Sequence, residues 1–264
     1  MVHEVARVGD DGDGDGDDDG AWGACIQSRS YWEERYGRDV AGGGDGGGEA
    51  FEFEWYVGWE SISSLVMGAL HLSPARARVL EVGCGSSRLA LDMALEGGFE
   101  NITAIDFAEE ATSEQRRIAA KEHAKDAVRF QVEDATAMSY KDESFDVVID
   151  KATLDTLMSN GSPFEAPRKL VAQVDRVLAP GGFYFLISHA DPRDEMGETL
   201  LRDVLLSSLS WEHRWRVDIH SAGELHCYAM QKTQRRKTRS LTAKMQRGEI
   251  FGPDDAVLRH HVHE

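Results

Sequence analysis

The chain has 264 residues, of which 41% are hydrophobic, and its formal net charge is −18. This length suffices for one large domain or two small ones with a real core. The acidic balance argues against nucleic acid as the main partner, because binding phosphates requires a basic surface. No apolar run approaches the roughly 18 residues of a membrane-spanning helix, so we expect no membrane segment.

The N-terminal region carries half of the net charge. Residues 1–50 contain 13 acidic and 4 basic residues, a net charge of −9, and residues 9–20 are only Asp and Gly. Such a composition buries too little apolar surface to offset the entropy lost on ordering, so we expect residues 1–30 to form a disordered acidic tail. The start lacks the basic and apolar regions of a secretory signal, and three scattered cysteines give no disulfide framework. We therefore expect a cytoplasmic protein.

Strand-like and helix-like segments alternate from residue 78 onward, after a glycine-rich connector expected over 41–48. Short apolar runs predict strands over 78–82, 101–107, 128–132, 145–149, 183–188, 215–219 and 224–230. Helical spacing or helix-forming composition predicts helices over 87–97, 109–125, 167–178 and 196–209. Strands separated by helices of this length form βαβ units, so the chain is predicted to have an α/β fold with a mostly parallel sheet.

The most informative segment is V-L-E-V-G-C-G-S-S over 79–87, where a strand ends in a glycine turn that opens a helix. Gly83 and Gly85 allow backbone N–H groups to approach a ligand closely. Asp106 ends the next strand, where a carboxylate can accept both hydroxyls of a ribose. Asp134 ends the third strand, and with the Ala135 backbone it can face an adenine ring. Together they predict a nucleoside-bearing ligand, with an ordinary tight turn and a turn-capping acid as the alternatives.

The glycine turn departs from the dinucleotide fingerprint G-x-G-x-x-G. Arg88 stands where that motif has its third glycine, and Glu81 stands where it usually has an apolar residue. The third glycine permits close packing beside a pyrophosphate. Both departures favour a nucleoside without a pyrophosphate, such as S-adenosyl-L-methionine, and disfavour a dehydrogenase.

Five segments between residues 31 and 232 together resemble a known family. V-L-E-V-G-C-G-S-S at 79–87 is similar to V-L-x-x-G-C-G-N-S, and F-D-V-V-I-D-K-A-T-L-D at 145–155 is similar to F-D-V-V-x-x-K-G-T-L-D. The segments Y-W-E-E-R-Y, F-E-W-Y and V-D-R-V-L-A-P-G-G, which begin at residues 31, 53 and 174, resemble the family's remaining elements. The family is that of the class I, seven-β-strand, S-adenosyl-L-methionine-dependent methyltransferases. Within it, the resemblance is to the lysine-methylating branch of elongation factor 1-alpha lysine methyltransferases (type 4 and methyltransferase-like 13 type) and citrate synthase lysine methyltransferase.

The resemblance implies a Rossmann-like three-layer sandwich, whose mostly parallel seven-stranded sheet ends in an antiparallel strand. It implies a methyltransferase domain over 31–232, in which residues 31–77 cover the cofactor. The residues that it implies around S-adenosyl-L-methionine are Trp32, Tyr36, Trp55, Gly83, Gly85, Asp106, Phe107, Asp134, Ala135 and Lys151. Two residues depart from the family pattern: Ser86 replaces Asn, and Ala152 replaces Gly. Because Ala disfavours positive φ, we expect Ala152 to adopt a negative φ.

The expected reaction is methyl transfer to a lysine side chain of an elongation factor 1-alpha-like protein. We expect the enzyme to be a monomer. A lysine amine has a pKa near 10.4, so its neutral form must be favoured, and aromatic walls that exclude water suit this task. Ordinary core packing is the alternative reading of those aromatics. Asp155 is the candidate for orienting the amine, with a helix-surface acid as the alternative. Lys151 is expected to face the cofactor edge, where its charge can meet a carboxylate, with a partnership with Asp150 or Asp155 as the alternative.

Two other functions remain open from the sequence. The same scaffold could methylate a small-molecule amine, thiol or carboxylate. It could also be a non-catalytic methyltransferase-like binding protein, which the intact glycine turn and Asp106 disfavour. Residues 233–264 are expected to be flexible, since the basic run over 232–239 is typical of a solvated tail; docking to an acidic partner or to the acidic N-terminus is the alternative. His260, His261 and His263 are expected to be an exposed terminus, because they lack companion ligands at the fixed spacing of a metal site. We therefore expect no metal.

Overall fold

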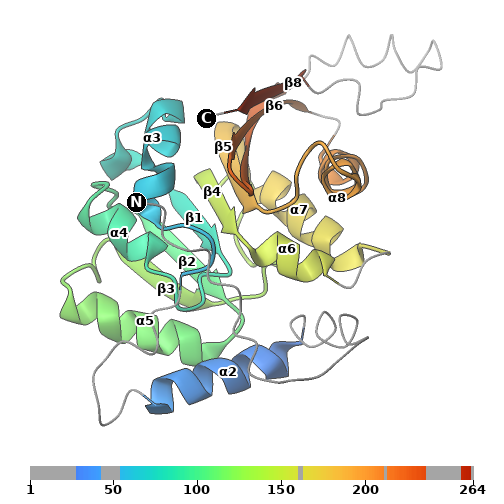
Figure 1. The fold of residues 1–264 in the computed structure, drawn as a ribbon. Coiled ribbons are helices and arrows are strands. Elements are labelled where there is room, and N and C mark those ends of the chain that lie inside the picture. Colours follow the sequence, from blue (N-terminus) through green and yellow to red (C-terminus); the bar gives the residue numbers. More distant parts are fainter. Residues whose placement is uncertain (1–27, 43–53, 160–162, 211–212, 236–256, 263–264) are drawn as a thin grey trace, which may run out of the picture.

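The computed structural model describes residues 28–42, 54–159, 163–210, 213–235 and 257–262, and Figure 1 traces their arrangement. Most of the expected acidic tail and of the glycine-rich connector falls outside these described residues. Within the described part of the chain, no helix is both long enough and apolar enough to cross a membrane.

One eight-stranded sheet forms the middle layer, with the strand order β3-β2-β1-β4-β5-β7-β6-β8. Its strands are β1 (Val79–Val82), β2 (Ile102–Asp106), β3 (Val128–Val132), β4 (Phe145–Lys151), β5 (Leu178–Ser188), β6 (His213–Ala222), β7 (Leu225–Arg235) and β8 (Val257–Val262). The first five run parallel, whereas β7 pairs antiparallel with both β5 and β6. The predicted α/β fold with a mostly parallel sheet is therefore confirmed.

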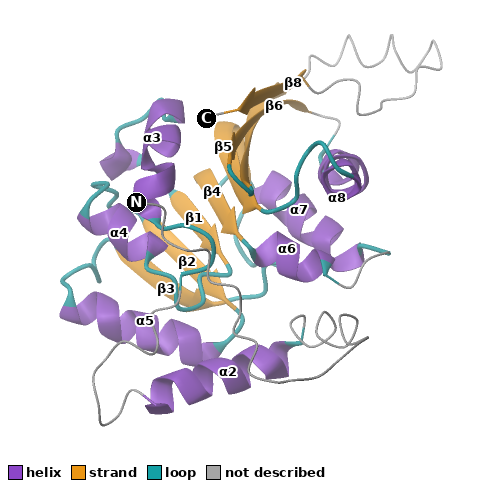
Figure 2. Ribbon diagram, in the orientation of Figure 1, coloured by secondary structure: helices purple, strands orange, loops and turns teal. Residues whose placement is uncertain are grey.

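Helices cover both faces of this sheet, as Figures 1 and 2 show. The helices are α2 (Arg29–Gly42), α3 (Trp59–Ala69), α4 (Leu89–Leu95), α5 (Glu109–Lys121), α6 (Thr153–Met158), α7 (Glu165–Val177) and α8 (Glu195–Thr199), and α8 continues as a π-helical segment, Leu200–Leu206. A short 3-10 helix, Pro74–Arg76, precedes β1. One buried apolar cluster packs helices α2, α3, α4 and α5 against one face of the sheet. A second packs α6, α7 and the π-helical segment Leu200–Leu206 against the other face. Two cores separated by a sheet make the three-layer sandwich.

The central strands are buried on both faces, which explains their nearly continuous apolar sequences. Every residue of β1 and β2 is buried. Parallel strands covered by helices on both sides have this composition, so their runs could be recognised without any alternation. The amphipathic stripe predicted near 167–178 is also confirmed, because Leu170, Val171 and Val174 of α7 are fully buried.

The structure departs from the expected elements at the C-terminal end. The segment A-P-G-G at 179–182, which directly follows the helix predicted over 167–178, lies inside β5, which begins at Leu178. Residues 257–262, within the segment expected to be flexible, form an eighth strand that pairs parallel with β6. An open strand edge exposes backbone N–H and C=O groups, and β8 satisfies those of β6. Sequence reasoning missed this strand because its residues carry no long apolar run.

Candidate functional site

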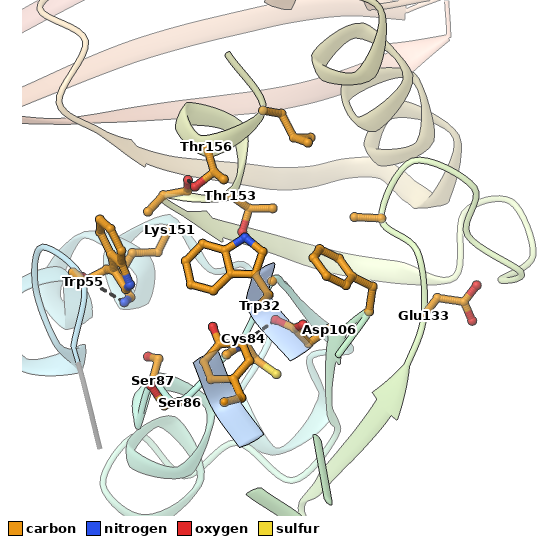
Figure 3. A pocket seen from close by; sticks show the side chains of 17 residues that line it. Trp32, Trp55, Cys84, Ser86, Ser87, Asp106, Glu133, Lys151, Thr153 and Thr156 are labelled. Atoms are coloured by element: carbon orange, nitrogen blue, oxygen red, sulfur yellow. Dashed lines mark hydrogen bonds between the residues drawn. The ribbon is translucent and has the colours of Figure 1, made fainter. Parts of the chain in front are cut away.

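A cleft opens at the carboxyl ends of β1, β2 and β4, where the strand order reverses around β1. In open α/β sheets, ligands bind at such a reversal. The cleft contains about 750 Å³ of space, a figure that includes open solvent at its mouth. Its lining, drawn in Figure 3, consists of Trp32, Tyr36, Trp55, Gly83, Cys84, Gly85, Ser86, Ser87, Asp106, Phe107, Glu133, Ala135, Lys151, Ala152, Thr153, Thr156 and Leu157.

The glycine turn forms the floor of the cleft and has no room for side chains. Gly83 has a φ of +64°, and a Cβ atom there would lie 2.0 Å from Thr153 Oγ1. Thr153 Oγ1 itself donates a hydrogen bond of 2.9 Å to the carbonyl of Val82. Gly85 has a φ of +48°, and its Cβ atom would lie 2.4 Å from the Tyr36 hydroxyl oxygen. Both positions therefore require glycine, for backbone conformation and for close packing.

Asp106 links the glycine turn to β2. The backbone N–H of Gly85 donates to Asp106 Oδ2 at 3.0 Å, and that of Ala108 donates to Oδ1 at 2.9 Å. Burial raises the pKa of Asp106 to about 6, against the opposing effect of these backbone hydrogen bonds. A carboxylate with both oxygens fixed and further lone pairs free can accept hydrogen bonds from a pair of vicinal hydroxyls.

Aromatic residues from the N-terminal part of the chain form the roof. Trp32 and Tyr36 of α2 are buried, and their rings stack with centroids 5.5 Å apart. Trp55 meets Trp32 edge to face at 6.3 Å. In Figure 3 the Trp32 indole projects into the middle of the cleft. The structure thus brings all three predicted aromatics to the same side of the cleft.

Lys151 at the end of β4 holds the N-terminal segment against the sheet. Its ammonium forms an ion pair with Glu54 and donates a hydrogen bond of 2.9 Å to the carbonyl of Trp55. Glu54 also accepts hydrogen bonds from Ser87 Oγ at 2.7 Å and from the backbone N–H of Arg88 at 3.1 Å. The alternative partners of Lys151, Asp150 and Asp155, were therefore wrong. Glu54 lies 97 residues away in the sequence, so no local pattern pointed to it.

The turn after β3 contributes Glu133 and Ala135 to the cleft lining but not Asp134. The Asp134 side chain is exposed, and its Oδ1 accepts 2.7 Å hydrogen bonds from the backbone N–H and the hydroxyl of Thr136. This is the turn-capping arrangement that the sequence left as the alternative. Phe107, predicted beside Asp106, does line the cleft.

Ala152 adopts a φ of +70°, so the expectation of a negative φ was wrong. The residue immediately precedes α6, and its carbonyl accepts hydrogen bonds from the backbone N–H and the hydroxyl of Thr156, which fixes the turn into the helix. The left-handed conformation costs a non-glycine residue about 1–2 kcal/mol. Helix packing evidently outweighs that cost.

Replacing Ala152 by Gly is expected to raise the free energy of unfolding by roughly 0.5–1 kcal/mol. The backbone strain at φ +70° is relieved, and only part of this gain is lost to the greater flexibility of glycine in the unfolded chain. Urea unfolding followed by circular dichroism measures the change. A loss of stability would mean that the Ala152 methyl group contributes more through packing than its conformation costs.

Asp155, the candidate for orienting an amine, lies on α6 directly beside the cleft residues Thr153 and Thr156. Its side chain is only 7% exposed and contacts Tyr56 and His189. The reading of Asp155 as an exposed helix-surface acid was therefore wrong. Sequence reasoning gave no role to Tyr56, although it ends the F-E-W-Y segment, and it missed His189, which belongs to none of the family segments.

The residues present fit S-adenosyl-L-methionine, the cofactor that the resemblance implies. Asp106 offers a fixed acceptor for ribose hydroxyls, and Phe107 and Leu157 offer apolar surface for an adenine ring. Buried Glu81 in β1 adds a third feature, because its Oε2 has no hydrogen-bond partner among the described residues. Burial raises the pKa of Glu81 to about 8. A cationic amino group, such as that of the methionine part, would compensate this buried carboxyl.

The known proteins that this chain resembles in the comparisons below are all named as methyltransferases. EEF1A lysine methyltransferase 4 of Mus musculus is 29% identical over 76% of this chain and 74% of that protein. The eEF1A lysine and N-terminal methyltransferase of Danio rerio is 36% identical over 62% of this chain, but this chain covers only 22% of that protein's length. A solved SAM-dependent methyltransferase of Methanosarcina mazei aligns with a TM-score of 0.47 at 19% identity, over 65% of this chain and 98% of that one. A methyltransferase domain family matches residues 74–244, well over half of the sequence. The chain belongs to this methyltransferase domain family.

Proposed function

We propose that this protein is an S-adenosyl-L-methionine-dependent protein-lysine N-methyltransferase and that its substrate is an elongation factor 1-alpha-like protein. The observation that carries the proposal is the similarity to EEF1A lysine methyltransferase 4, which extends over 76% of this chain. The longer relatives are named eEF1A lysine and N-terminal methyltransferases. We also propose that the protein acts as a monomer in the cytoplasm.

The chain's own residues supply binding and orientation. The cofactor provides an electrophilic methyl group, and the protein holds it on the glycine turn and Asp106. Buried Trp32 and Tyr36, together with Trp55, line the cleft with aromatic surface, and such desolvation favours the neutral form of an incoming amine. Holding the amine and the methyl carbon about 3–3.5 Å apart supplies on the order of 7–11 kcal/mol of the barrier. Positioning is therefore the main contribution of the protein.

The alternatives make different claims about the acceptor. A small-molecule methyltransferase would use the same cleft but would transfer no label to protein. A non-catalytic binding protein would lack a working cofactor site, whereas Gly83, Gly85 and Asp106 all line this cleft. The similarity to named lysine methyltransferases favours a protein substrate over both.

Incubation of the purified protein with tritiated S-adenosyl-L-methionine and recombinant elongation factor 1-alpha tests the proposal. Label on a lysine of the factor, located by mass spectrometry, is the expected result. A lysate fractionated by size is incubated in parallel. Label confined to small molecules would replace the proposed function by the small-molecule alternative, and no transfer in either sample would favour the binding protein.

The affinity for S-adenosylhomocysteine is expected to fall as the pH drops through about 6. Asp106 accepts the ribose hydroxyls in its ionised form, and its pKa lies at about 6, so protonation below that value removes acceptor capacity. The loss approaches about tenfold per pH unit below the pKa. Calorimetric titrations from pH 7.5 to 5 measure it. Asp106→Asn, which cannot ionise, separates this effect from the titration of Glu81, and an identical slope in that variant would contradict the assignment.

A further inference from the structure

Three polar side chains converge beside the cofactor cleft. The Tyr56 hydroxyl donates to Asp155 Oδ2 at 2.9 Å and lies 2.7 Å from His189 Nδ1. His189 Nδ1 in turn lies 3.1 Å from the same Asp155 oxygen. The three atoms form a closed triangle built from three separate segments: the stretch before α3, helix α6 and the residue after β5.

This triangle lies next to the cofactor cleft. Tyr56 follows Trp55, and Asp155 lies between Thr153 and Thr156, so each is a direct neighbour of cleft-lining residues. On its other side the triangle opens to solvent, because 51% of the His189 side chain is exposed while the Asp155 side chain is nearly covered. A group arriving from solvent can therefore reach Asp155 past His189.

The surrounding structure holds the triangle in place. Tyr56 adopts a φ of +65°, a conformation that costs about 1–2 kcal/mol for a residue with a side chain. Ser188 Oγ donates to Asp155 Oδ1 at 2.7 Å, and the backbone N–H of His189 donates to Oδ2 at 3.3 Å. Lys151 fixes the segment that carries Tyr56 through the Trp55 carbonyl. Backbone strain kept by such a network is typical of functional sites.

Asp155 is a nearly buried carboxylate whose recorded ion-pair partner, within the described residues, is His189. When this histidine is neutral, the carboxylate keeps its hydrogen bonds but has no cationic partner among the described residues. Burial and the neighbouring Asp155 raise the pKa of Tyr56 above its usual range, so its hydroxyl stays protonated. The site thus offers an anion, a neutral phenol and an imidazole, a combination that suits an alkylammonium group.

We propose that Tyr56, Asp155 and His189 form the binding site for the acceptor amine, in which Asp155 holds the ammonium and His189 accepts its proton. This inference rests on the proposed function and assigns residues to its acceptor side. After the proton has moved to His189, the nitrogen lone pair forms the new C–N bond. The C–S bond breaks with its electron pair remaining on sulfur, which leaves S-adenosylhomocysteine. Tyr56 orients the amine as a neutral hydrogen-bonding partner.

The site predicts how the rate depends on pH. His189 accepts a proton only when neutral, and its pKa is raised chiefly by the hydrogen bond to Asp155, with a further contribution from Asp194 at the start of α8. Asp150 is the other acid that acts on this cluster, through its effect on Tyr56. The value of kcat/KM should therefore rise with pH through a limb that lies above 6.5, the ordinary pKa of histidine.

Kinetics with recombinant elongation factor 1-alpha test the roles separately. Asp155→Asn is expected to lower kcat/KM at least about 100-fold, mainly through KM, since it removes the charge that holds the ammonium. His189→Gln is expected to lower kcat about 100-fold and to remove the acid limb. Tyr56→Phe is expected to cost about tenfold. The control His71→Gln changes an exposed histidine outside the cleft and should leave all values unchanged.

Cofactor affinity separates this site from a purely structural network. All three variants should bind S-adenosylhomocysteine within about twofold of the original protein, because none of the three residues lines the cofactor cleft. Folded variants with intact cofactor binding, unchanged kcat/KM and an unchanged pH profile would overturn the inference.

A titration without the protein substrate keeps the inference testable if the factor is not methylated. In the S-adenosylhomocysteine complex, n-butylammonium is added as a probe while the Cε1–H resonance of His189 is followed by NMR. A saturable shift that is lost in Asp155→Asn supports the amine site, even when the proposed protein target has failed. No shift, or an equal shift in Asp155→Asn, would overturn it while leaving the methyltransferase assignment intact.

Discussion

Replacing Asp106 by alanine is expected to weaken S-adenosylhomocysteine binding at least about 100-fold. The carboxylate is held by the backbone N–H groups of Gly85 and Ala108, so its remaining lone pairs are fixed toward the cleft. Each hydrogen bond to a charged acceptor contributes roughly 1.5–3 kcal/mol, and two such bonds to a ribose would be lost. Since about 1.4 kcal/mol corresponds to a factor of ten, a 100-fold loss is the lower bound. Isothermal titration calorimetry measures it.

Asp134→Ala is the matched control for this variant. The Asp134 side chain is exposed and bonded within its own turn to Thr136, so its removal should change the affinity by less than about threefold. An equal loss in both variants would restore the adenine-facing role that the sequence predicted for Asp134. Unchanged affinity in Asp106→Ala would remove the ribose role from Asp106.

Gly83→Ala is expected to lower the free energy of unfolding by roughly 2–5 kcal/mol and to abolish cofactor binding. Two costs add here. The φ of +64° costs a residue with a Cβ atom about 1–2 kcal/mol. Overpacking against Thr153 Oγ1, only 2.0 Å from the new Cβ atom, costs roughly 1–3 kcal/mol more. Urea unfolding and calorimetry measure both effects.

Gly98→Ala separates the two costs. Gly98 has a similar φ of +69°, but nothing lies within 4 Å of an added Cβ atom. This control should lose only about 1–2 kcal/mol and should keep its affinity for S-adenosylhomocysteine. If Gly83→Ala lost no more stability than Gly98→Ala, the contact with Thr153 would contribute nothing to the requirement for glycine.

The strands and the glycine turn could be predicted because their signals are local. The apolar runs in β1, β2 and β4 reflect burial on both faces, and the G-C-G turn follows β1 directly in the sequence. Asp106 could be placed beside the turn because parallel strands end at the same edge of the sheet. For this reason, most of the predicted cofactor residues do line one cleft.

The contacts that close the site could not be predicted, because they join residues far apart in the sequence. Glu54 and Lys151 are 97 residues apart, and Tyr56 and His189 are 133 residues apart. No periodicity or motif links such positions. The choice between Glu133 and Asp134 was also beyond the sequence, since adjacent acids in one turn differ only in direction.

The pairing of β8 with β6 has a practical consequence for work with this protein. Val257–Val262 runs alongside Arg216–Ser221, and His260 Nε2 lies 2.9 Å from Ser221 Oγ. Without β8, those residues of β6 would present free amide and carbonyl groups, a template on which strands of other molecules can add. β8 thus covers this edge of β6 and itself becomes the edge strand of the sheet. Removal of residues 257–262 would expose the backbone edge of the longer strand β6 and is expected to increase self-association.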